Sequence, residues 1–383
     1  MSDNFTEATR ESWGSRLMGS IKGVSFGFIL SIAGIMLLFW NEGRAVKTYK
    51  GLKEGKGVVI SLNSSKVDPK NDGKLIHLTG ELSAEGELKE NFLDYQLSNT
   101  IALQRKVEMF QWKEETRSET KKNLGGSQET VTTYEYKKTW SEIPIKSDNF
   151  KKKGYDNPSE SQWACISQTF YVDKIKVGDF VLSENLKKGL SNFEKVNLSN
   201  EWIKNAKHEN LNVTEGYIYI KKNKKSKEDE IGDIRVSYSI LKPQTVSIVA
   251  VQRGSSFEPY QPKTGPQIEM IKMGIHTAEQ MFQAAIQGNK TLTWILRVVG
   301  SFLVMFGIGL VFKPLVVVAD VVPFLGNILQ AGVGIFSFVI GGGISFIVIA
   351  IAWFYYRPIL SISLIAISVL LYFLFRRKRK TAA

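Results

Sequence analysis

The side chains that most often do chemistry are few and scattered in this 383-residue chain. The three histidines, His77, His208 and His276, lie far apart, and none has a second histidine or a cysteine at the spacing of a metal site. The single cysteine, Cys165, lies between two apolar residues, which is typical of a small buried side chain. The sequence therefore predicts no metal site and no cofactor.

Isolated carboxylates are the next candidates for chemistry. Glu42 and Glu108 are single acids among polar neighbours, where a salt bridge is the commoner use and general acid catalysis the alternative. The chain has no Gly-x-Ser-x-Gly motif and no phosphate-binding loop. We therefore expect a protein without catalytic residues that is not an enzyme.

Four apolar runs, at residues 23–40, 293–312, 328–354 and 359–375, dominate the two ends of the chain. Each has about the 20 residues that a helix needs to cross the hydrocarbon core. They predict a multi-pass α-helical membrane protein with one N-terminal and three C-terminal transmembrane helices. No small-residue cleavage pattern follows the first run, so it is expected to remain as an anchor.

The basic tail sets the predicted topology. The tail is residues 376–383, which follow the last run. It begins with five basic residues: Arg376, Arg377, Lys378, Arg379 and Lys380. Such a cluster favours a cytoplasmic C-terminus and contact with anionic headgroups. Four crossings then make residues 1–22 cytoplasmic and residues 41–290 extracytoplasmic. The net charge of +13 does not indicate a nucleic-acid partner, because its densest cluster adjoins a membrane helix.

Residues 41–290 predict a β-rich α+β domain, with a twisted antiparallel sheet or barrel-like core and a helical or irregular insertion at about 145–215. Period-two alternation marks seven segments: 57–62, 74–82, 100–113, 130–140, 217–222, 233–241 and 245–252. Residues 276–287 predict an amphipathic helix, since Thr277 and Gln280 have the spacing of a capping box.

Small residues inside the apolar runs predict close helix packing. Gly23, Gly27 and Ser31 recur every four residues, and Gly341 and Ser345 have the same spacing. This pattern allows helix backbones to approach within a chain or between copies. A homo-oligomer is therefore expected.

Residues 313–327 predict an interfacial or re-entrant segment, because their apolar stretch is too short to cross a membrane. Asp320 lies in this segment. Its carboxylate could line an ion path or face water at the headgroup level, and the sequence favours the second. Arg297, one turn inside its run, is expected to extend its charge toward the interface.

Several local motifs resemble the transmembrane protein 43 (LUMA) family. They run in order through most of the chain, at residues 41–48, 107–112, 134–142, 157–159, 232–238 and 353–358. The resemblance implies four transmembrane helices, a lumenal-side domain and, in animals, residence in the endoplasmic reticulum and inner nuclear membrane. It also implies a role in organising membrane complexes with lamina-associated partners. The lysine- and asparagine-rich residues 221–225 suit a bacterial member, with its domain exported across the cytoplasmic membrane.

Two functions remain open from the sequence. In the first, the protein is a non-enzymatic scaffold that binds membrane lipids through its helices and protein partners through its exported domain. In the second, it conducts ions or moves lipid, and the exported domain is the gate. The runs at 23–40, 328–354 and 359–375 contain no charge, whereas most water-filled paths have polar linings. The sequence therefore favours the scaffold.

Overall fold

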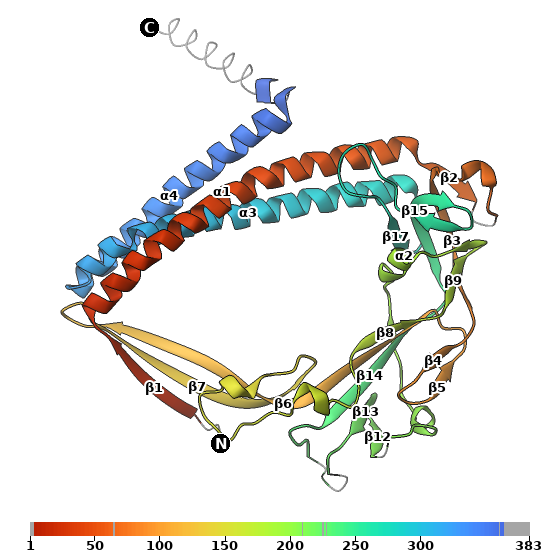
Figure 1. Ribbon diagram of the computed structural model, residues 1–383, viewed down its shortest axis with the longest axis horizontal. Coiled ribbons are helices and arrows are strands. Elements are labelled where there is room, and N and C mark those ends of the chain that lie inside the picture. Colours follow the sequence, from red (N-terminus) through yellow and green to blue (C-terminus); the bar gives the residue numbers. More distant parts are fainter. Residues whose placement is uncertain are drawn as a thin grey trace, which may run out of the picture.

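A computed structural model describes residues 4–63, 66–208, 210–223, 226, 228–359 and 361–363. A β-rich domain, a long β arm and three long helices make up this part of the chain (Figure 1). Most of the predicted fourth helix, 359–375, and the whole basic tail, 376–383, lie outside the described residues.

Among the described residues, three helices are long and apolar enough to cross a membrane: α1 (Trp13–Val58), α3 (Ala278–Ala319) and α4 (Pro323–Tyr356). The helix α2 (Glu184–Lys188) is short. The predicted capping box starts α3: the Gln280 amide donates to Thr277 Oγ1 at 3.2 Å, and Gln280 Oε1 accepts from the Thr277 amide at 2.9 Å. The sequence placed residues 41–58 in the β-rich domain, but in the structure they are the last part of α1.

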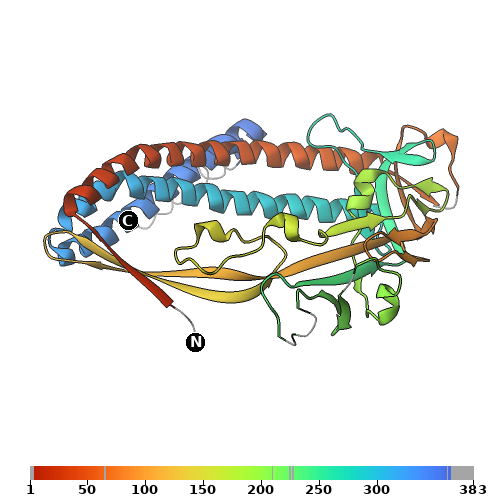
Figure 2. The ribbon, with the colours of Figure 1, turned by 60° about the horizontal axis from the view of Figure 1, so that its bottom comes forward.

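The long helices form a bundle. Pairs such as Gly27 with Gly307 and Gly34 with Gly300 place α1 antiparallel to α3 (Figure 2). After a tight turn at Asp320, Pro323 starts α4, as suits a residue that has no amide hydrogen to leave unbonded. The predicted segment 313–327 is thus the end of α3, this turn and the start of α4.

Two antiparallel-rich sheets form the β domain. Six of the seven predicted strand segments are confirmed, and the segment 57–62 is a strand only from Ile60, because residues 57 and 58 end α1. The larger sheet has the order β1-β7-β6-β14-β13-β12, with β8 on β6 and β11 on β14. Its strands are β1 (Asn4–Glu11), β6 (Ala102–Lys122), β7 (Gln128–Ser141), β8 (Gln168–Tyr171), β11 (Glu194–Lys195), β12 (Leu211–Thr214), β13 (Tyr217–Ile220) and β14 (Ile234–Leu241).

The second sheet has the order β10-β9-β3-β15-β16, with β17 on β15 and β2 parallel to β3. Its strands are β2 (Ile60–Asn63), β3 (Leu75–Glu85), β9 (Lys174–Val177), β10 (Phe180–Val181), β15 (Thr245–Arg253), β16 (Ser256–Glu258) and β17 (Met270–Met273). A separate hairpin joins β4 (Leu88–Glu90) and β5 (Tyr95–Leu97).

Short elements fill the predicted insertion at 145–215. Besides β8 to β12 and α2 it holds the 3-10 turns Ser147–Asn149, Glu160–Gln162 and Asn200–Ile203; Pro69–Asn71 forms a further turn. One apolar core lies around β3 and β15, with Leu78, Phe180 and Ile248 fully buried. A second lies around β6 and β14, with Val107 and Tyr238 fully buried. Both cores use the inward positions of the predicted alternation.

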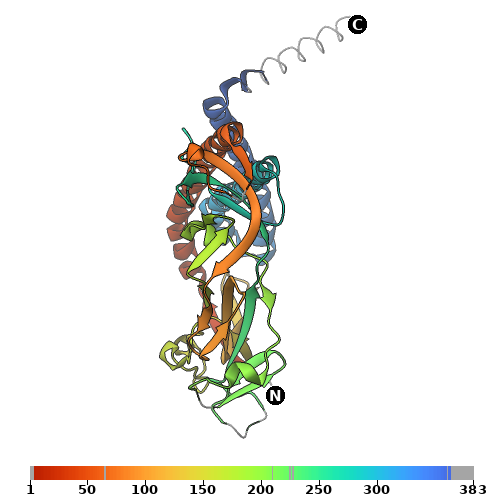
Figure 3. The same ribbon diagram turned by 90° about the vertical axis from the view of Figure 1, so that its right-hand side faces the viewer.

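A three-stranded arm extends from the domain. It consists of β1, β7 and the outer part of β6, residues 109–122, which pair in continuous antiparallel register. At about 3.3 Å per residue, the 21 residues of β6 extend roughly 69 Å, which matches the 46 residues of α1 at about 1.5 Å each. The arm therefore reaches the far end of the α1–α3 pair, where the frame of arm, domain and helices closes (Figure 1). The end-on view shows the helices toward one side of the molecule and most of the strands toward the other (Figure 3).

Candidate functional site

A buried ion pair joins the three long helices where the apolar run of α1 ends. The Arg297 guanidinium on α3 donates to both oxygens of Glu42 on α1, from Nε at 2.6 Å and Nη2 at 3.0 Å. Trp353 Nε1 on α4 donates to the same carboxylate at 2.9 Å. Glu42 is fully buried and Arg297 is 11% exposed, so the predicted salt bridge for Glu42 is confirmed. Arg297 meets this carboxylate at the domain-side end of its own apolar run, and the extension of its charge toward the interface stays a prediction.

Further polar groups continue this junction along α1 and α3. Asn41 Nδ2 donates to the Thr293 carbonyl at 3.0 Å, and Arg44 donates to Asn289 Oδ1 and Thr293 Oγ1, both at 3.0 Å. Asn289 in turn donates to the Ala45 carbonyl at 3.0 Å. Such bonds satisfy groups that would be costly to leave unpaired away from water.

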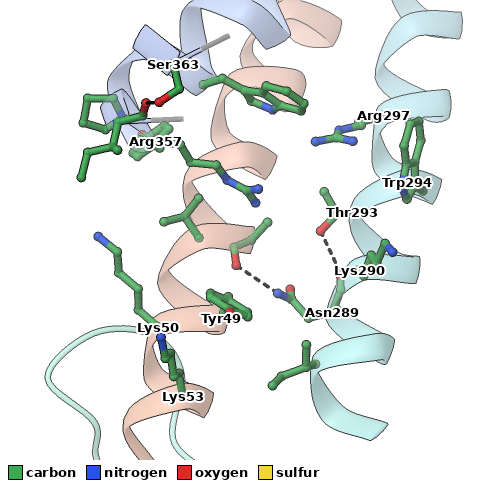
Figure 4. Close-up of a pocket in the computed structure, with 17 residues that line it drawn as sticks. Tyr49, Lys50, Lys53, Asn289, Lys290, Thr293, Trp294, Arg297, Arg357 and Ser363 are labelled. Carbon is green, nitrogen blue, oxygen red and sulfur yellow. Dashed lines mark hydrogen bonds between the residues drawn. The ribbon is translucent and has the colours of Figure 1, made fainter. Parts of the chain in front are cut away.

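A half-open cavity of about 1100 Å³ lies beside the junction, between α1, α3 and the end of α4 (Figure 4). Aromatic and aliphatic side chains form much of its wall, including Tyr49, Trp294, Trp353 and Ile359. Basic side chains from all three helices also line it. The cavity therefore combines an apolar wall with positive charge at the end of an apolar helical segment.

A second charge cluster lies where the arm meets the end of α3 and the start of α1. Asp320, in the α3–α4 turn, pairs with Arg16 of α1 and, at 2.9 Å, with Lys122 of the arm. The Asp320 side chain is 1% exposed, so the expectation that its charge faces water is wrong. Trp13 Nε1 donates to the Val317 carbonyl at 2.9 Å in the same region. Asp320 therefore holds the arm, α1 and the turn together.

The tip of the arm fits against α1 through a glycine turn. Gly125 and Gly126 have φ values of 86° and 77°, which other residues rarely adopt. The Trp13 ring occupies the place where a side chain on Gly126 would lie. The Gly125 amide donates to the Val321 carbonyl at 3.0 Å. Glycine is thus required here for both the turn and the contact.

These contacts conflict with the predicted topology. Residues 4–11 pair with residues 128–135 strand to strand, although the sequence placed them on opposite sides of the membrane. A membrane cannot separate hydrogen-bonded neighbours, and the polar, exposed strands of the arm cannot lie in hydrocarbon. In this structure the N-terminal strand lies along the arm of the β domain.

Small residues make the closest helix contacts. A Cβ on Gly27 would lie 2.6 Å from the Gly307 carbonyl oxygen, and one on Gly34 would lie 2.8 Å from that of Gly300. Ser31 also contacts Gly307. The prediction of close packing therefore holds for Gly27 and Ser31 within the chain.

Other predicted packing positions behave differently. Nothing lies within 4 Å of a Cβ built on Gly23, so this residue is not at a contact among the described residues. A Cβ on Gly341 would lie 2.8 Å from Met305 Cα, and the buried Ser345 hydroxyl donates to the Gly341 carbonyl at 2.7 Å. Gly341 thus packs α4 onto α3, and Ser345 is bonded within α4.

The remaining candidates from the sequence lie apart from both clusters. His77 is in β3, where its Nδ1 lies 3.2 Å from the Ser61 hydroxyl and its Nε2 lies 2.8 Å from the His276 carbonyl oxygen. Burial lowers the pKa of its imidazole. Burial acts to raise the pKa of Glu108, but hydrogen bonds from Arg235 and Lys106 lower it below the ordinary value. The predicted salt bridge of Glu108 is thus confirmed.

The Cys165 thiol and the His208 ring both pack against neighbouring side chains of the β domain. Burial raises the pKa of Cys165 to about 11, which leaves the thiol protonated at neutral pH. The ring of His208 stacks on Phe92 at a centroid distance of 4.4 Å. Within the described residues, no three His, Cys, Asp or Glu side chains are grouped to hold a metal ion.

Sequence reasoning missed the partners of both buried acids. The signal for Glu42 was present, since Glu42 and Arg297 have opposite charges at the domain-side ends of the first two apolar runs. No comparable signal linked Asp320 to Lys122, because Lys122 is one of many lysines in a polar stretch. The two clusters hold helices together, and neither places a nucleophile beside a base.

Three apolar helices with a large β-rich domain define an integral membrane protein. A family model described as Transmembrane protein 43 matches residues 109–358, and the chain belongs to this family. It is similar to Transmembrane protein 43 of Pongo abelii (31% identical, covering 93% of this chain and 88% of that protein) and of Homo sapiens (30%; 90% and 87%). The Transmembrane protein 43 homolog of Drosophila melanogaster is 27% identical, over 94% of both chains. No solved structure matches the chain.

Proposed function

We propose that this protein is a non-enzymatic membrane scaffold that organises membrane protein complexes. Its helices hold it in the bilayer, and its β domain and arm present the surface that binds protein partners. The observation that carries the proposal is the closed frame, fixed by the ion pairs of Asp320 at one end of the α1–α3 pair and of Glu42 in its interior. A frame braced at two separate places keeps its binding surfaces in a constant arrangement.

In this proposal the apolar middle parts of α1, α3 and α4 lie in the membrane, and the β domain and arm lie outside it. The β1–β7 pairing keeps the N-terminal strand on the arm. Large apolar side chains such as Phe28, Ile32 and Phe302 are exposed there, which suits contact with lipid. Association between copies, anionic-lipid contact at the basic tail, and the compartment stay predictions.

Conduction of ions or movement of lipid has less support. Asp320, the acid considered for an ion path, is neutralised by Arg16 and Lys122. The α1–α3 contact is made by glycines whose backbones meet directly, which leaves no room for water between them.

The test compares complex formation with transport. Native membranes that contain the protein are solubilised in mild detergent and its complexes are sized by native mass spectrometry, while purified protein in vesicles is assayed for cation flux and lipid scrambling. We expect stoichiometric complexes with other membrane proteins and vesicles no leakier than empty ones. A protein recovered only alone, or an Asp320-dependent flux, would contradict the proposal.

A further inference from the structure

We propose that the cavity between α1, α3 and the end of α4 binds one anionic phospholipid. The inference starts from four basic side chains that line it: Lys50, Lys53, Lys290 and Arg357. The three lysines are exposed and Arg357 is partly exposed. None of the four makes an ion pair with a carboxylate among the described residues, whereas Arg297 in the same wall is already neutralised by Glu42.

The apolar part of the cavity accounts for the rest of the ligand. Val46, Tyr49, Trp294 and Trp353 form a wall in which apolar surface predominates, and Ile359 is 82% exposed beside it. A cavity of about 1100 Å³ is larger than a free phosphate or a small polar metabolite needs. An acyl chain against this wall would cover surface that is otherwise open.

The position of the cavity fits a lipid at the membrane interface. On α1 the apolar run ends at Trp40, and Tyr49, Lys50 and Lys53 follow within the same helix. Tryptophan and tyrosine favour the headgroup level, and lysine and arginine there attract anionic headgroups. Phosphate would thus lie among the basic side chains (Figure 4), and the acyl chains would extend along the helices.

The experiment uses the full chain in detergent, titrated with phosphatidylglycerol or with phosphatidylcholine of the same acyl chains and measured by native mass spectrometry. A variant with Lys50→Gln, Lys53→Gln and Arg357→Gln removes three rim charges. Its control, Lys121→Gln with Lys188→Gln and Lys204→Gln, removes three exposed charges elsewhere. A second variant, Ile359→Glu, adds a negative charge at the rim of the cavity.

We expect one phosphatidylglycerol to bind in preference to phosphatidylcholine. The rim variant should lose affinity on the order of 100-fold, since each of the three basic groups near an anionic headgroup contributes about a factor of five. Ile359→Glu should weaken binding as well, and the control should bind like the wild type. The unfolding temperature without added lipid should be the same for all four proteins, which separates a loss of binding from a loss of folding.

Three results would overturn the proposal. Equal binding of phosphatidylcholine would mean that the cavity selects only acyl chains. Competition by soluble glycerol phosphate at similar concentration would mean a site for free phosphate. Unchanged binding of phosphatidylglycerol by the rim variant would mean that these basic side chains hold no lipid. No binding of either lipid to the wild type would mean the same.

Discussion

At the residue scale, the buried pair of Glu42 and Arg297 is where a single change should matter most. Replacing Glu42 by Ala leaves the Arg297 charge in the bundle with no counter-charge, and also removes the acceptor of Trp353 Nε1. We expect a loss of about 3–5 kcal/mol in unfolding free energy, as for other buried pairs that lose one partner. Chemical denaturation in detergent measures this loss.

An exposed ion pair between the same two helices is the matched control. Lys56 and Glu279 also join α1 to α3, but their side chains are 33% and 55% exposed. Lys56→Ala should therefore cost less than about 1 kcal/mol. Equal effects of Glu42→Ala and Lys56→Ala would contradict the assignment of Glu42 as the buried link.

The imidazole of His77 should make stability depend on pH. Burial lowers the pKa of His77 in the folded protein, so the unfolded chain binds the proton more readily. The stability that this residue contributes is present above its unfolded pKa of about 6.5 and is lost as the pH falls through the lower, folded pKa. As the pH is lowered from 7.5 to 5.5, the unfolding temperature should fall more steeply for the wild type than for His77→Gln. Parallel curves would show that His77 does not titrate in this way.

At the scale of elements, strands inside the domain could be predicted and the arm could not be predicted in full. Residues 100–113 alternate because one face of β6 is buried in a core. Beyond Lys113 the strand is polar on both faces, so the period-two signal stops although β6 continues to Lys122. Likewise α1 extends past its apolar run through buried small residues such as Gly51 and Gly55, which hydropathy does not detect.

The contact between α1 and α3 gives a prediction with an internal control. Gly27→Ile should push the helices apart, because the space for its side chain is occupied by the Gly307 backbone. We expect a loss of about 1–3 kcal/mol, typical of overpacking. Gly23→Ile adds the same bulk where no atom lies within 4 Å, and should leave stability nearly unchanged.

Thermal unfolding of both variants in detergent checks this prediction. If Gly23→Ile were the more damaging change, Gly23 would lie on a contact between copies, and the present account of the helix pair would be wrong. The four-residue spacing alone could not distinguish these two glycines, since it fixes a helix face but not which turn meets the neighbour.

At the scale of the whole molecule, Asp320 should keep the arm against the helices. Asp320→Ala leaves Arg16 and Lys122 facing each other without the acid between them. We expect the arm tip to detach and limited trypsin digestion after Lys121 and Lys122 to become several-fold faster. Glu119→Ala, on an exposed side chain of the same strand, is the control and should digest at the wild-type rate.

The closed frame is also the part of the molecule that the sequence could not predict. Charge rules orient a chain by its flanks and do not include strand pairing between residues more than a hundred positions apart. They therefore placed residues 4–11 and residues 128–135 on opposite sides of the membrane, whereas the structure pairs them.

A cross-link between β1 and β7 in intact membranes tests this frame most directly. Thr6 and Thr133 are direct neighbours in the register, so cysteines at both positions in a Cys165→Ser background should cross-link through a short bifunctional thiol reagent. The off-register pair of Thr6 with Thr130 should react much less. We predict rapid cross-linking of the matched pair without detergent. No cross-link in membranes, with only one of the two cysteines reached by an impermeant thiol reagent, would place the strands on opposite sides and contradict the closed frame.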